Sequence, residues 1–294
     1  GMQLVYACRL FKEIAVKKGE KEDAVWCDDI VGELEKILNS DHVWDGAWYR
    51  RLLLSDGTPV GSADRKQGQI YLNSQSWSVL SGIAAAGHGV DAMEAVESML
   101  DTPYGFTLCT PPYKGFPEPE DPPRGSAPGA NENGGILFHA NTWAIMAEAV
   151  LGRRERAMKC FKRIIPEILA SNLGEERYER EPYSVCSNIA GVQNPLFGRG
   201  NGSWLSGTAN WLYIAATQYL FGIKPELDGL AIKPCLPDEF RKVTIRRRFR
   251  GTLYIIEIDN RNRTSQKLYV DGVVQDSPLV VSVENDECHI LCEC

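Results

Sequence analysis

A buried helix is predicted by the stretch ANWLYIAATQYLF, residues 209–221, which is apolar on almost every side. After residue 221 the hydrophobic period changes from that of helices to that of strands. This change divides the chain into a helical domain, residues 2–222, and a small antiparallel β domain, residues 223–294. We therefore expect a mainly α protein with a sandwich-like β domain at its C-terminal end.

The second domain contains short segments in which apolar and polar residues alternate. Such alternation, bounded by turn residues, predicts a strand in each segment. The segments are residues 230–233, 243–249, 253–258, 267–270, 279–283 and 289–292. Asp271-Gly272 predicts a hairpin turn in this domain.

The first domain shows apolar residues at helical spacing. The segments predicted as helices are residues 4–15, 27–38, 77–84, 92–99, 143–150 and a continuing series at 157–168. Gly19 fits the C-cap of the first helix, so the first two helices are expected to run antiparallel. Paired helices of similar length would suit a helical toroid.

The chain has 294 residues, of which 44% are hydrophobic and 24% charged, so it can bury a substantial core. The formal net charge of −7 provides no positive field that would attract nucleic acid or an anionic membrane. We find no signal peptide and no run of about 18 apolar residues. Nine cysteines, an odd number spread along the chain, favour a reduced, cytoplasmic protein.

Two clusters near the C-terminus resemble ligand sites but have simpler explanations. Cys288, His289, Cys292 and Cys294 have side chains that could hold zinc, but their spacing is not that of standard zinc sites. We favour a strand end there and expect no metal site. The basic run at residues 246–250 could grip phosphate, but the acidic chain favours a solvated strand face.

Long connections rich in glycine and proline separate the helices. Residues 101–135 and 171–207 are such connections, and loops of this length usually belong to binding or active sites. Three segments combine aromatic, amide, carboxylate and small residues, as sugar sites do: residues 44–50, 131–143 and 203–211. Tryptophans at helical spacing also serve as packing residues, so each segment taken singly fits a core as well.

The third segment also fits an anion site. Ser206-Gly207-Thr208 stands directly before the apolar helix, where backbone N–H groups and the positive end of the helix dipole favour an anion. A plain N-cap explains Ser206 or Thr208 about as well. His139 stands where a Gly-Gly turn meets a helix, and it is either a phosphate ligand or a structural hydrogen-bond donor.

Several motifs follow one another along the chain. They are Trp44-Asp45-Gly46-x-Trp48-Tyr49-Arg50-Arg51, Asn73-Ser74-Gln75-Ser76-Trp77-Ser78-Val79-Leu80-Ser81-Gly82, Asn131-Glu132-Asn133-Gly134-Gly135-x3-His139-Ala140-Asn141-Thr142-Trp143, Glu181-Pro182-Tyr183, and Phe197-Gly198-Arg199 followed by Ser203-Trp204-Leu205-Ser206-Gly207-Thr208-Ala209. Together they resemble glycoside hydrolase family 94, the family of cellobiose and chitobiose phosphorylases. The resemblance runs without a gap from the first helix to the C-terminus, and it corresponds to the C-terminal part of the family's enzymes.

The resemblance implies an incomplete (α/α)6 helical toroid followed by a β domain. It also implies inverting phosphorolysis, in which inorganic phosphate attacks a β-linked disaccharide and releases an α-sugar 1-phosphate. Phosphate is the co-substrate, and no cofactor is expected. By the family pattern the phosphate-binding residues are His139, Ser206 and Gly207, and the sugar-binding residues are Glu132, Trp143, Tyr183 and Ser187.

This chain departs from the family pattern in three ways. The family's catalytic aspartate, its phosphate-binding arginine and its N-terminal β domain correspond to sequence before the first helix. No catalytic residue is therefore assigned here, and the general acid is expected upstream. Ser187 replaces a glutamine that reads the donor sugar in several members, whereas Ser206 replaces a threonine and keeps its hydroxyl.

Three functions fit these observations. The first is the C-terminal part of a glycoside phosphorylase, inactive alone without its general acid. The second is a non-catalytic remnant that binds sugar or phosphate. The third is a toroid hydrolase that uses Glu132 or Glu181 with water, but Gly207 and His139 suit an anion better than a water.

An incomplete toroid would also leave apolar helix faces uncovered. Leu4, Ala7, Phe11 and Ile14 form such a stripe on the first helix. Because water does not stabilise an exposed stripe, we expect a homo-oligomer or association with a missing N-terminal half. The alternative is a rearranged, smaller bundle that stays monomeric.

Overall fold

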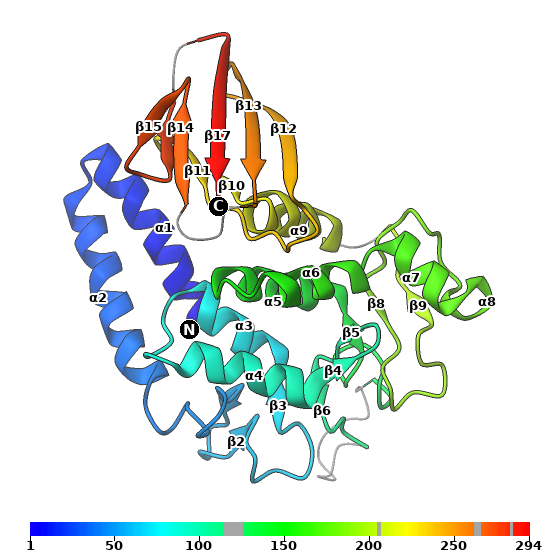
Figure 1. Cartoon of the computed structure of the whole chain (residues 1–294). Coiled ribbons are helices and arrows are strands. Elements are labelled where there is room, and N and C mark those ends of the chain that lie inside the picture. Colours follow the sequence, from blue (N-terminus) through cyan, green and yellow to red (C-terminus); the bar gives the residue numbers. More distant parts are fainter. Residues whose placement is uncertain (115–125, 205–206, 262–265, 283–284) are drawn as a thin grey trace.

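The computed structural model describes residues 1–114, 126–204, 207–261, 266–282 and 285–294. A helical part is followed by a β-rich part that ends the chain (Figure 1). The helices are α1 (Met2–Lys18), α2 (Lys21–Leu38), α3 (Leu72–Leu80), α4 (His88–Leu100), α5 (Phe138–Val150), α6 (Arg154–Arg163), α7 (Pro166–Leu173), α8 (Glu175–Tyr178) and α9 (Thr208–Ile214), which continues as the π-helix η1 (Ala215–Leu220). The prediction of a helical region followed by a sheet region is confirmed.

Helices α1 and α2 form the antiparallel pair that the sequence predicts (Figure 1). Gly19 ends α1 with φ 82°, a left-handed conformation that glycine adopts without strain. Buried Cys8 of α1 faces buried Cys27 of α2. The predicted uncovered stripe is confirmed, since its four residues are all exposed: Leu4, Ala7, Phe11 and Ile14.

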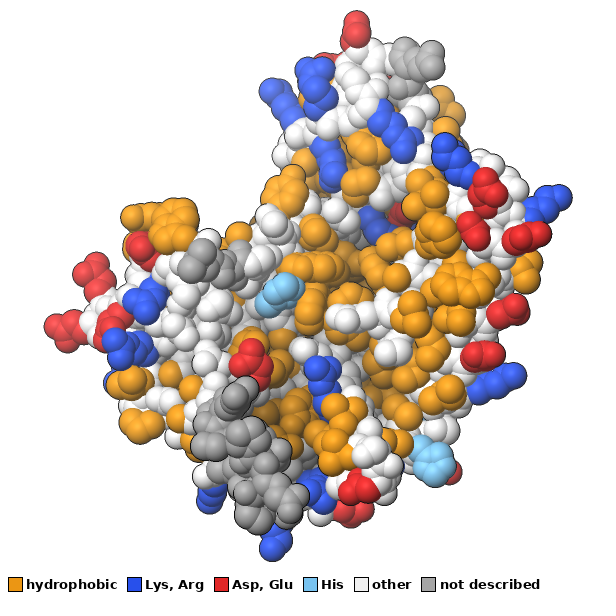
Figure 2. Space-filling view, turned by 180° about the vertical axis from the view of Figure 1, so that it is seen from behind, with side chains coloured by type: hydrophobic (Ala, Val, Ile, Leu, Met, Phe, Trp, Pro, Cys, Tyr) orange, Lys and Arg blue, Asp and Glu red, His pale blue; other side chains and the backbone are white. Residues whose placement is uncertain are grey.

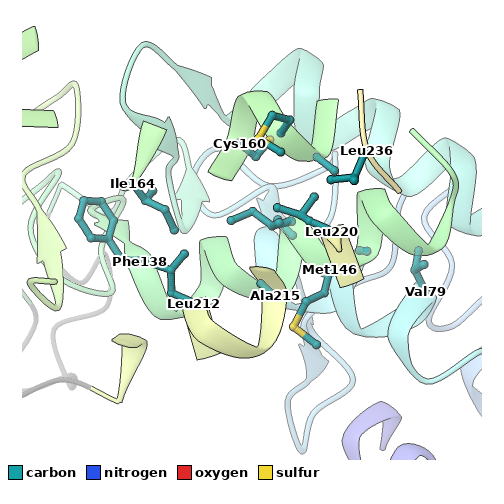
Figure 3. Packing of buried hydrophobic residues seen from close by; sticks show 14 of the residues in the cluster. Val79, Phe138, Met146, Cys160, Ile164, Leu212, Ala215, Leu220 and Leu236 are labelled. Carbon is teal, nitrogen blue, oxygen red and sulfur yellow. The ribbon is translucent and has the colours of Figure 1, made fainter. Parts of the chain in front are cut away.

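Helix α5 lies at the centre of the helical part and packs against α3, α6, α9 and η1. Buried side chains from these helices meet in one core, among them Phe138 and Met146 of α5, Leu212 of α9 and Leu220 of η1 (Figure 3). The core continues into the β part, where Tyr254 belongs to it. Because both parts share this core, the proposed domain boundary at residue 222 stays a prediction.

Three helix predictions are wrong in detail. Helix α3 ends at Leu80, so Ile83 lies beyond it, because Gly82 takes a left-handed conformation. The series at 157–168 is broken into α6 and α7, because Pro166 has no N–H to continue a helix and instead begins the next one. The last helix is not buried all round, since Tyr213 of α9 is exposed on a flank that no described segment covers.

The β part contains two sheets. Its strands are β10 (Ile223–Pro225), β11 (Gly229–Ile232), β12 (Lys242–Phe249), β13 (Thr252–Asp259), β14 (Lys267–Val270), β15 (Val273–Gln275), β16 (Leu279–Val281) and β17 (Glu287–Glu293). Strands β10, β11 and β16 form one sheet, and the other has the order β12-β13-β17-β14-β15. The turn at Asp271-Gly272 joins β14 to β15 with both residues at positive φ, as predicted.

The prediction of a purely antiparallel β domain is wrong in one pairing. Strands β13 and β17 run parallel, with Ile256 beside Ile290. Strand β17 inserts between β13 and β14 after the chain has passed through β14, β15 and β16. A long connection of this kind leaves the strand direction free, whereas a tight hairpin requires antiparallel neighbours.

Cys288, His289 and Cys292 lie on strand β17 and Cys294 directly follows it, so the cluster is at a strand end, as favoured from the sequence. Cys288 and Cys292 are buried on one side of β17, whereas His289 is exposed on the other. Within the ranges given above, no three His, Cys, Asp or Glu side chains are placed to hold a metal ion. In the same ranges no helix has the length and hydropathy needed to cross a membrane.

The basic run lies on strand β12. Arg246 and Arg248 are exposed on one side of the strand. Arg247 points the other way and donates a hydrogen bond to the Ile223 carbonyl oxygen at 2.7 Å. This arrangement matches the solvated strand face that the sequence favours.

Candidate functional site

The loops of the helical part are held together by two-residue strands. These strands are β1 (Leu52–Leu53), β2 (Pro59–Val60), β3 (Ile70–Tyr71), β4 (Asp101–Thr102), β5 (Gly105–Phe106), β6 (Cys109–Thr110), β7 (Ile136–Leu137), β8 (Asn188–Ile189) and β9 (Gly200–Asn201). The last three form one sheet, in which Asn188 pairs with Leu137 on one side and with Asn201 on the other. This register brings three distant segments together at one end of the sheet. They are the start of α5, the residue before β8 and the loop that leads into α9.

Backbone hydrogen bonds hold Ser187 at this end of the sheet. The Phe138 N–H donates to the Ser187 carbonyl oxygen at 3.0 Å, so Ser187 lies beside the first turn of α5. The Ser187 N–H in turn donates to the carbonyl oxygens of Asn201 (3.2 Å) and Gly202 (3.1 Å). The Ser187 hydroxyl donates to Oδ1 of Asn188 at 2.7 Å.

Asn131 fastens the loop that carries Glu132 to the same sheet. Its Oδ1 accepts hydrogen bonds from Nδ2 of Asn188 at 3.3 Å and from Nδ2 of Asn201 at 3.2 Å. Its backbone has φ 45°, a left-handed conformation that asparagine tolerates better than most residues. Glu132, the next residue, is exposed and therefore free to face solvent or a ligand.

His139 and Gly207 lie close together at this end of the sheet. A Cβ atom built on Gly207 would lie 3.6 Å from Cε1 of His139. Gly207 is the N-cap of α9, so the backbone N–H groups of the first helical turn point toward this place. Nε2 of His139 is buried and has no hydrogen-bond partner within the described residues. Burial lowers the pKa of the His139 imidazole.

Aromatic rings continue from His139 along the inner helices. The ring of Trp143, one turn further along α5, lies 4.6 Å from that of His139 between centroids. Trp143 also contacts Trp211 of α9 at 5.8 Å and Trp77 of α3 at 5.2 Å, and Trp77 contacts Tyr6 of α1 at 5.6 Å. The helices α1, α3 and α9 therefore each contribute one ring to this aromatic row, and α5 contributes two.

Tyr183 lies apart from this contact, on the surface. Its ring is 75% exposed and lies 6.2 Å from that of Trp204, which is 69% exposed. The Trp204 indole N–H donates to Oε1 of Glu181 at 3.2 Å, and Trp204 has φ 66°. Hydrogen bonds, first from its own backbone N–H and then from neighbours that include this indole, lower the pKa of Glu181. Glu181 is thus ionised at neutral pH and unsuited to act as a general acid.

The structure thus brings together His139, Gly207 and Trp143, with Ser187 beside them through the backbone. Glu132 belongs to a loop tied to the same sheet, whereas Tyr183 pairs with Trp204. Ser206, expected to bind phosphate, lies outside the described residues.

Two residues at the sheet and its loops were not singled out from the sequence. Asn131 links the Glu132 loop to β8 and β9, and its position in the Asn-Glu-Asn-Gly-Gly turn was the available signal. Trp204 has no sequence signal for its left-handed backbone, because tryptophan rarely adopts positive φ.

A comparison with known families identifies the family of this chain. The profile of the catalytic domain of the glycosyl hydrolase 94 superfamily matches residues 1–222. The chain therefore belongs to glycoside hydrolase family 94, and the resemblance inferred from the motifs is confirmed.

Two of the relatives are named as phosphorylases. A solabiose phosphorylase of Paenibacillus borealis is 35% identical over 247 residues, which are 83% of this chain and 32% of that protein. An N,N′-diacetylchitobiose phosphorylase of Vibrio proteolyticus is 34% identical over 266 residues, 89% of this chain and 32% of that protein. This chain therefore spans about a third of the length of these curated relatives.

A solved structure described as a sialidase shares the fold. Its TM-score is 0.62 at 15% sequence identity, and the match covers 99% of this chain and 26% of that chain. At this identity the likeness concerns the fold alone.

Proposed function

We propose that this chain forms the phosphate-binding side and part of the sugar-binding side of an inverting glycoside phosphorylase. The relatives described above are phosphorylases, two of them named for the disaccharides solabiose and N,N′-diacetylchitobiose. All the proposed ligand residues fall within residues 1–222, the part that matches the family profile. We further propose that α1 to α9 form part of an (α/α)6 toroid.

In the proposed reaction an oxygen of inorganic phosphate bonds to the anomeric carbon of a β-linked disaccharide. The bond from that carbon to the bridging oxygen breaks, and attack from the opposite face gives an α-sugar 1-phosphate. The leaving oxygen takes a proton from a general acid. The family pattern assigns that acid to sequence before residue 1, so no residue of this chain is proposed as the proton donor.

The contact between His139 and Gly207 is the observation that carries this proposal. An anion beside Gly207 would accept hydrogen bonds from the N–H groups of the first turn of α9 and from Nδ1 of His139, the ring nitrogen that lies 3.9 Å from a Cβ built on Gly207. The lowered pKa leaves His139 neutral at pH 7, so it can donate one N–H. We propose that the Ser206 hydroxyl adds a further donor.

The sugar is proposed to contact Ser187, Glu132, Trp143 and Tyr183. The Ser187 hydroxyl donates to Asn188, so its oxygen remains available to accept from a sugar hydroxyl. The exposed Glu132 carboxylate is an acceptor, and the rings of Trp143 and Tyr183 offer flat apolar faces.

Calorimetric titration with inorganic phosphate tests the proposal. We expect one binding site, and His139→Ala should weaken its affinity by at least about tenfold because a donor to an anion is lost. His289→Ala, which changes an exposed histidine on β17, is the matched control and should leave the affinity unchanged. Equal phosphate affinities for the wild type and His139→Ala would contradict the proposal.

The assignment of the general acid outside this chain has its own test. Without a positioned general acid the rate falls by about 10²–10⁴-fold, so the chain alone should bind phosphate and sugar with little turnover. We expect no detectable sugar 1-phosphate when the chain is incubated with N,N′-diacetylchitobiose and phosphate. Rapid release of that product would show that this chain contains its own acid.

A further inference from the structure

Trp143 also lines a pocket that includes neither His139 nor Gly207. It has a volume of about 290 Å³ and lies between the first residues of α1, the segment around Arg51, and the inner helices α3 and α5. Its lining includes Met2, Asn73, Trp77 and Trp143. Of these residues, only Trp143 belongs to the proposed phosphate and sugar site.

Three of the residues that line this pocket each have a buried polar atom without a hydrogen-bond partner. Nε1 of Trp77, Nε1 of Trp143 and Oδ1 of Asn73 have no hydrogen-bond partner in the described parts of the chain. Trp77 is only 7% exposed, so water does not readily supply the missing bond. An unpaired buried polar group costs about 1–3 kcal/mol, and three around one cavity indicate that the cavity accepts a polar molecule.

The chemistry of the walls defines the class of that molecule. Two indole N–H groups can only donate, and the Asn73 oxygen can only accept. The rings of Trp77 and Trp143 lie 5.2 Å apart at 66°, so they enclose the space with flat apolar surfaces. A pyranose ring fits this combination, because it presents apolar C–H faces and hydroxyl groups that both donate and accept.

The pocket lies near the proposed phosphate site. The Trp143 ring that lines it also lies 4.6 Å from the His139 ring, so only one indole separates the two places. Arg51 lines the same pocket, and no ion pair of its side chain occurs among the residues that the structure describes. Its guanidinium can therefore donate to further hydroxyl groups of a ligand in the pocket.

We propose that this pocket is a sugar subsite in which Trp77 and Trp143 donate their indole N–H groups to sugar hydroxyls and Asn73 Oδ1 accepts from one. The ligand class rests on the proposed function, whereas the unpaired atoms and the cavity do not depend on it. Asn73, Trp77 and Arg51 are then sugar-contacting residues in addition to those assigned by the family motifs.

Nuclear magnetic resonance of ¹⁵N-tryptophan-labelled protein tests the subsite, with D-glucose and N-acetyl-D-glucosamine as probes. The indole N–H signals, assigned by single Trp→Phe variants, should shift for Trp77 and Trp143. Trp77→Phe, which keeps an aromatic ring but removes the donor, should weaken sugar affinity by about three- to tenfold. Trp26→Phe, which changes an exposed ring on α2, is the matched control and should have no effect.

Two results would overturn the subsite: indole signals of Trp77 and Trp143 that do not move with either sugar, or a Trp77→Phe variant with wild-type sugar affinity. A thermal unfolding curve for each variant shows whether it is folded. A parallel phosphate titration separates this inference from the proposed function, because phosphate binding is expected to depend on His139 and not on Trp77. If the wild-type protein binds phosphate but its indole signals do not respond to sugar, the subsite is rejected and the proposed function is not.

Discussion

Gly207 and His139 face each other so closely that a Cβ atom on Gly207 would lie 3.6 Å from Cε1 of the imidazole. The two residues begin different helices, α9 and α5, which pack against each other. The contact therefore places a ring nitrogen beside the N-terminal end of a helix. That combination of a side-chain donor and backbone donors suits an anion.

Gly207→Ala should weaken phosphate binding without destabilising the fold. The backbone of Gly207 has φ −70° and ψ −3°, which alanine adopts readily, and a distance of 3.6 Å is an ordinary van der Waals contact. The variant should therefore unfold at nearly the wild-type temperature. Its new methyl group, however, occupies the approach to the helix start, so phosphate affinity should fall by about tenfold or more.

Gly32→Ala provides the matched control for this substitution. Gly32 lies inside α2, and nothing lies within 4 Å of a Cβ built on it. Alanine should stabilise that helix by about 1 kcal/mol and leave phosphate binding unchanged. A Gly207→Ala variant that also binds phosphate normally would count against an anion at this position.

Asn131 should be important for the stability of the loop that carries Glu132. Asn131→Ala removes the acceptor for Asn188 and Asn201 and forces alanine into a left-handed conformation at φ 45°. We expect a loss of about 2–3 kcal/mol in the free energy of unfolding measured with urea. Asn131→Gly restores the conformation but not the acceptor, so it should recover about 1 kcal/mol of that loss. Equal stabilities for the wild type and Asn131→Ala would exclude this role.

The sequence predicted those site residues that belong to continuous motifs. His139 and Trp143 are one helical turn apart, so their proximity follows from the predicted helix. The contact with Gly207 could not be predicted in the same way. It depends on the sheet of β7, β8 and β9, whose two-residue strands are too short to show an alternating pattern.

The sequence predicted about as much of the fold as of the site. Apolar periodicity located most of the helices and the strands of the β part, because burial of one face imposes that period. It gave no information on strand direction, so the parallel pairing of Ile256 with Ile290 was missed. The left-handed backbone of Trp204 was also unpredictable, because tryptophan rarely adopts a positive φ.

Glu148 on α5 should make stability depend on pH. Its side chain is 1% exposed, and Oε2 lies 3.4 Å from Nη1 of Arg153. Burial raises the pKa of Glu148 above its ordinary value of 4.5, although Arg156 and Arg153 oppose the shift. A raised pKa in the folded state means that the contribution to stability is present below pH 4.5 and is lost as the pH rises through the folded-state value.

Glu148→Gln removes this titration while keeping the shape of the side chain. The stability of the variant relative to the wild type should therefore improve as the pH rises from 4 toward 7, by at most about 1.4 kcal/mol per pH unit. Urea unfolding at a series of pH values measures the difference. A relative stability that is constant with pH would show that Glu148 is not perturbed.

The exposed stripe on α1 should cause self-association. Phe11 is 43% exposed, and hydrophobic side chains gather over the side of the molecule formed by α1 and α2 (Figure 2). We predict a dimer in sedimentation experiments that Phe11→Glu dissociates, because a charge cannot be buried there without a partner. Val16→Glu changes an exposed residue on another face of α1 and is the control. A wild-type monomer at all concentrations would contradict this prediction.

The central claim is that His139 binds phosphate, and the ring resonances of His139 test it most directly. A pH titration of those resonances with and without inorganic phosphate gives the pKa of the ring in both states. We predict a pKa below the ordinary value of 6.5 in the free protein, because burial disfavours the charged ring. Phosphate should raise it, because an adjacent anion stabilises the imidazolium. A His139 pKa that does not change at saturating phosphate, with the His289 signals as an internal reference, would contradict the account.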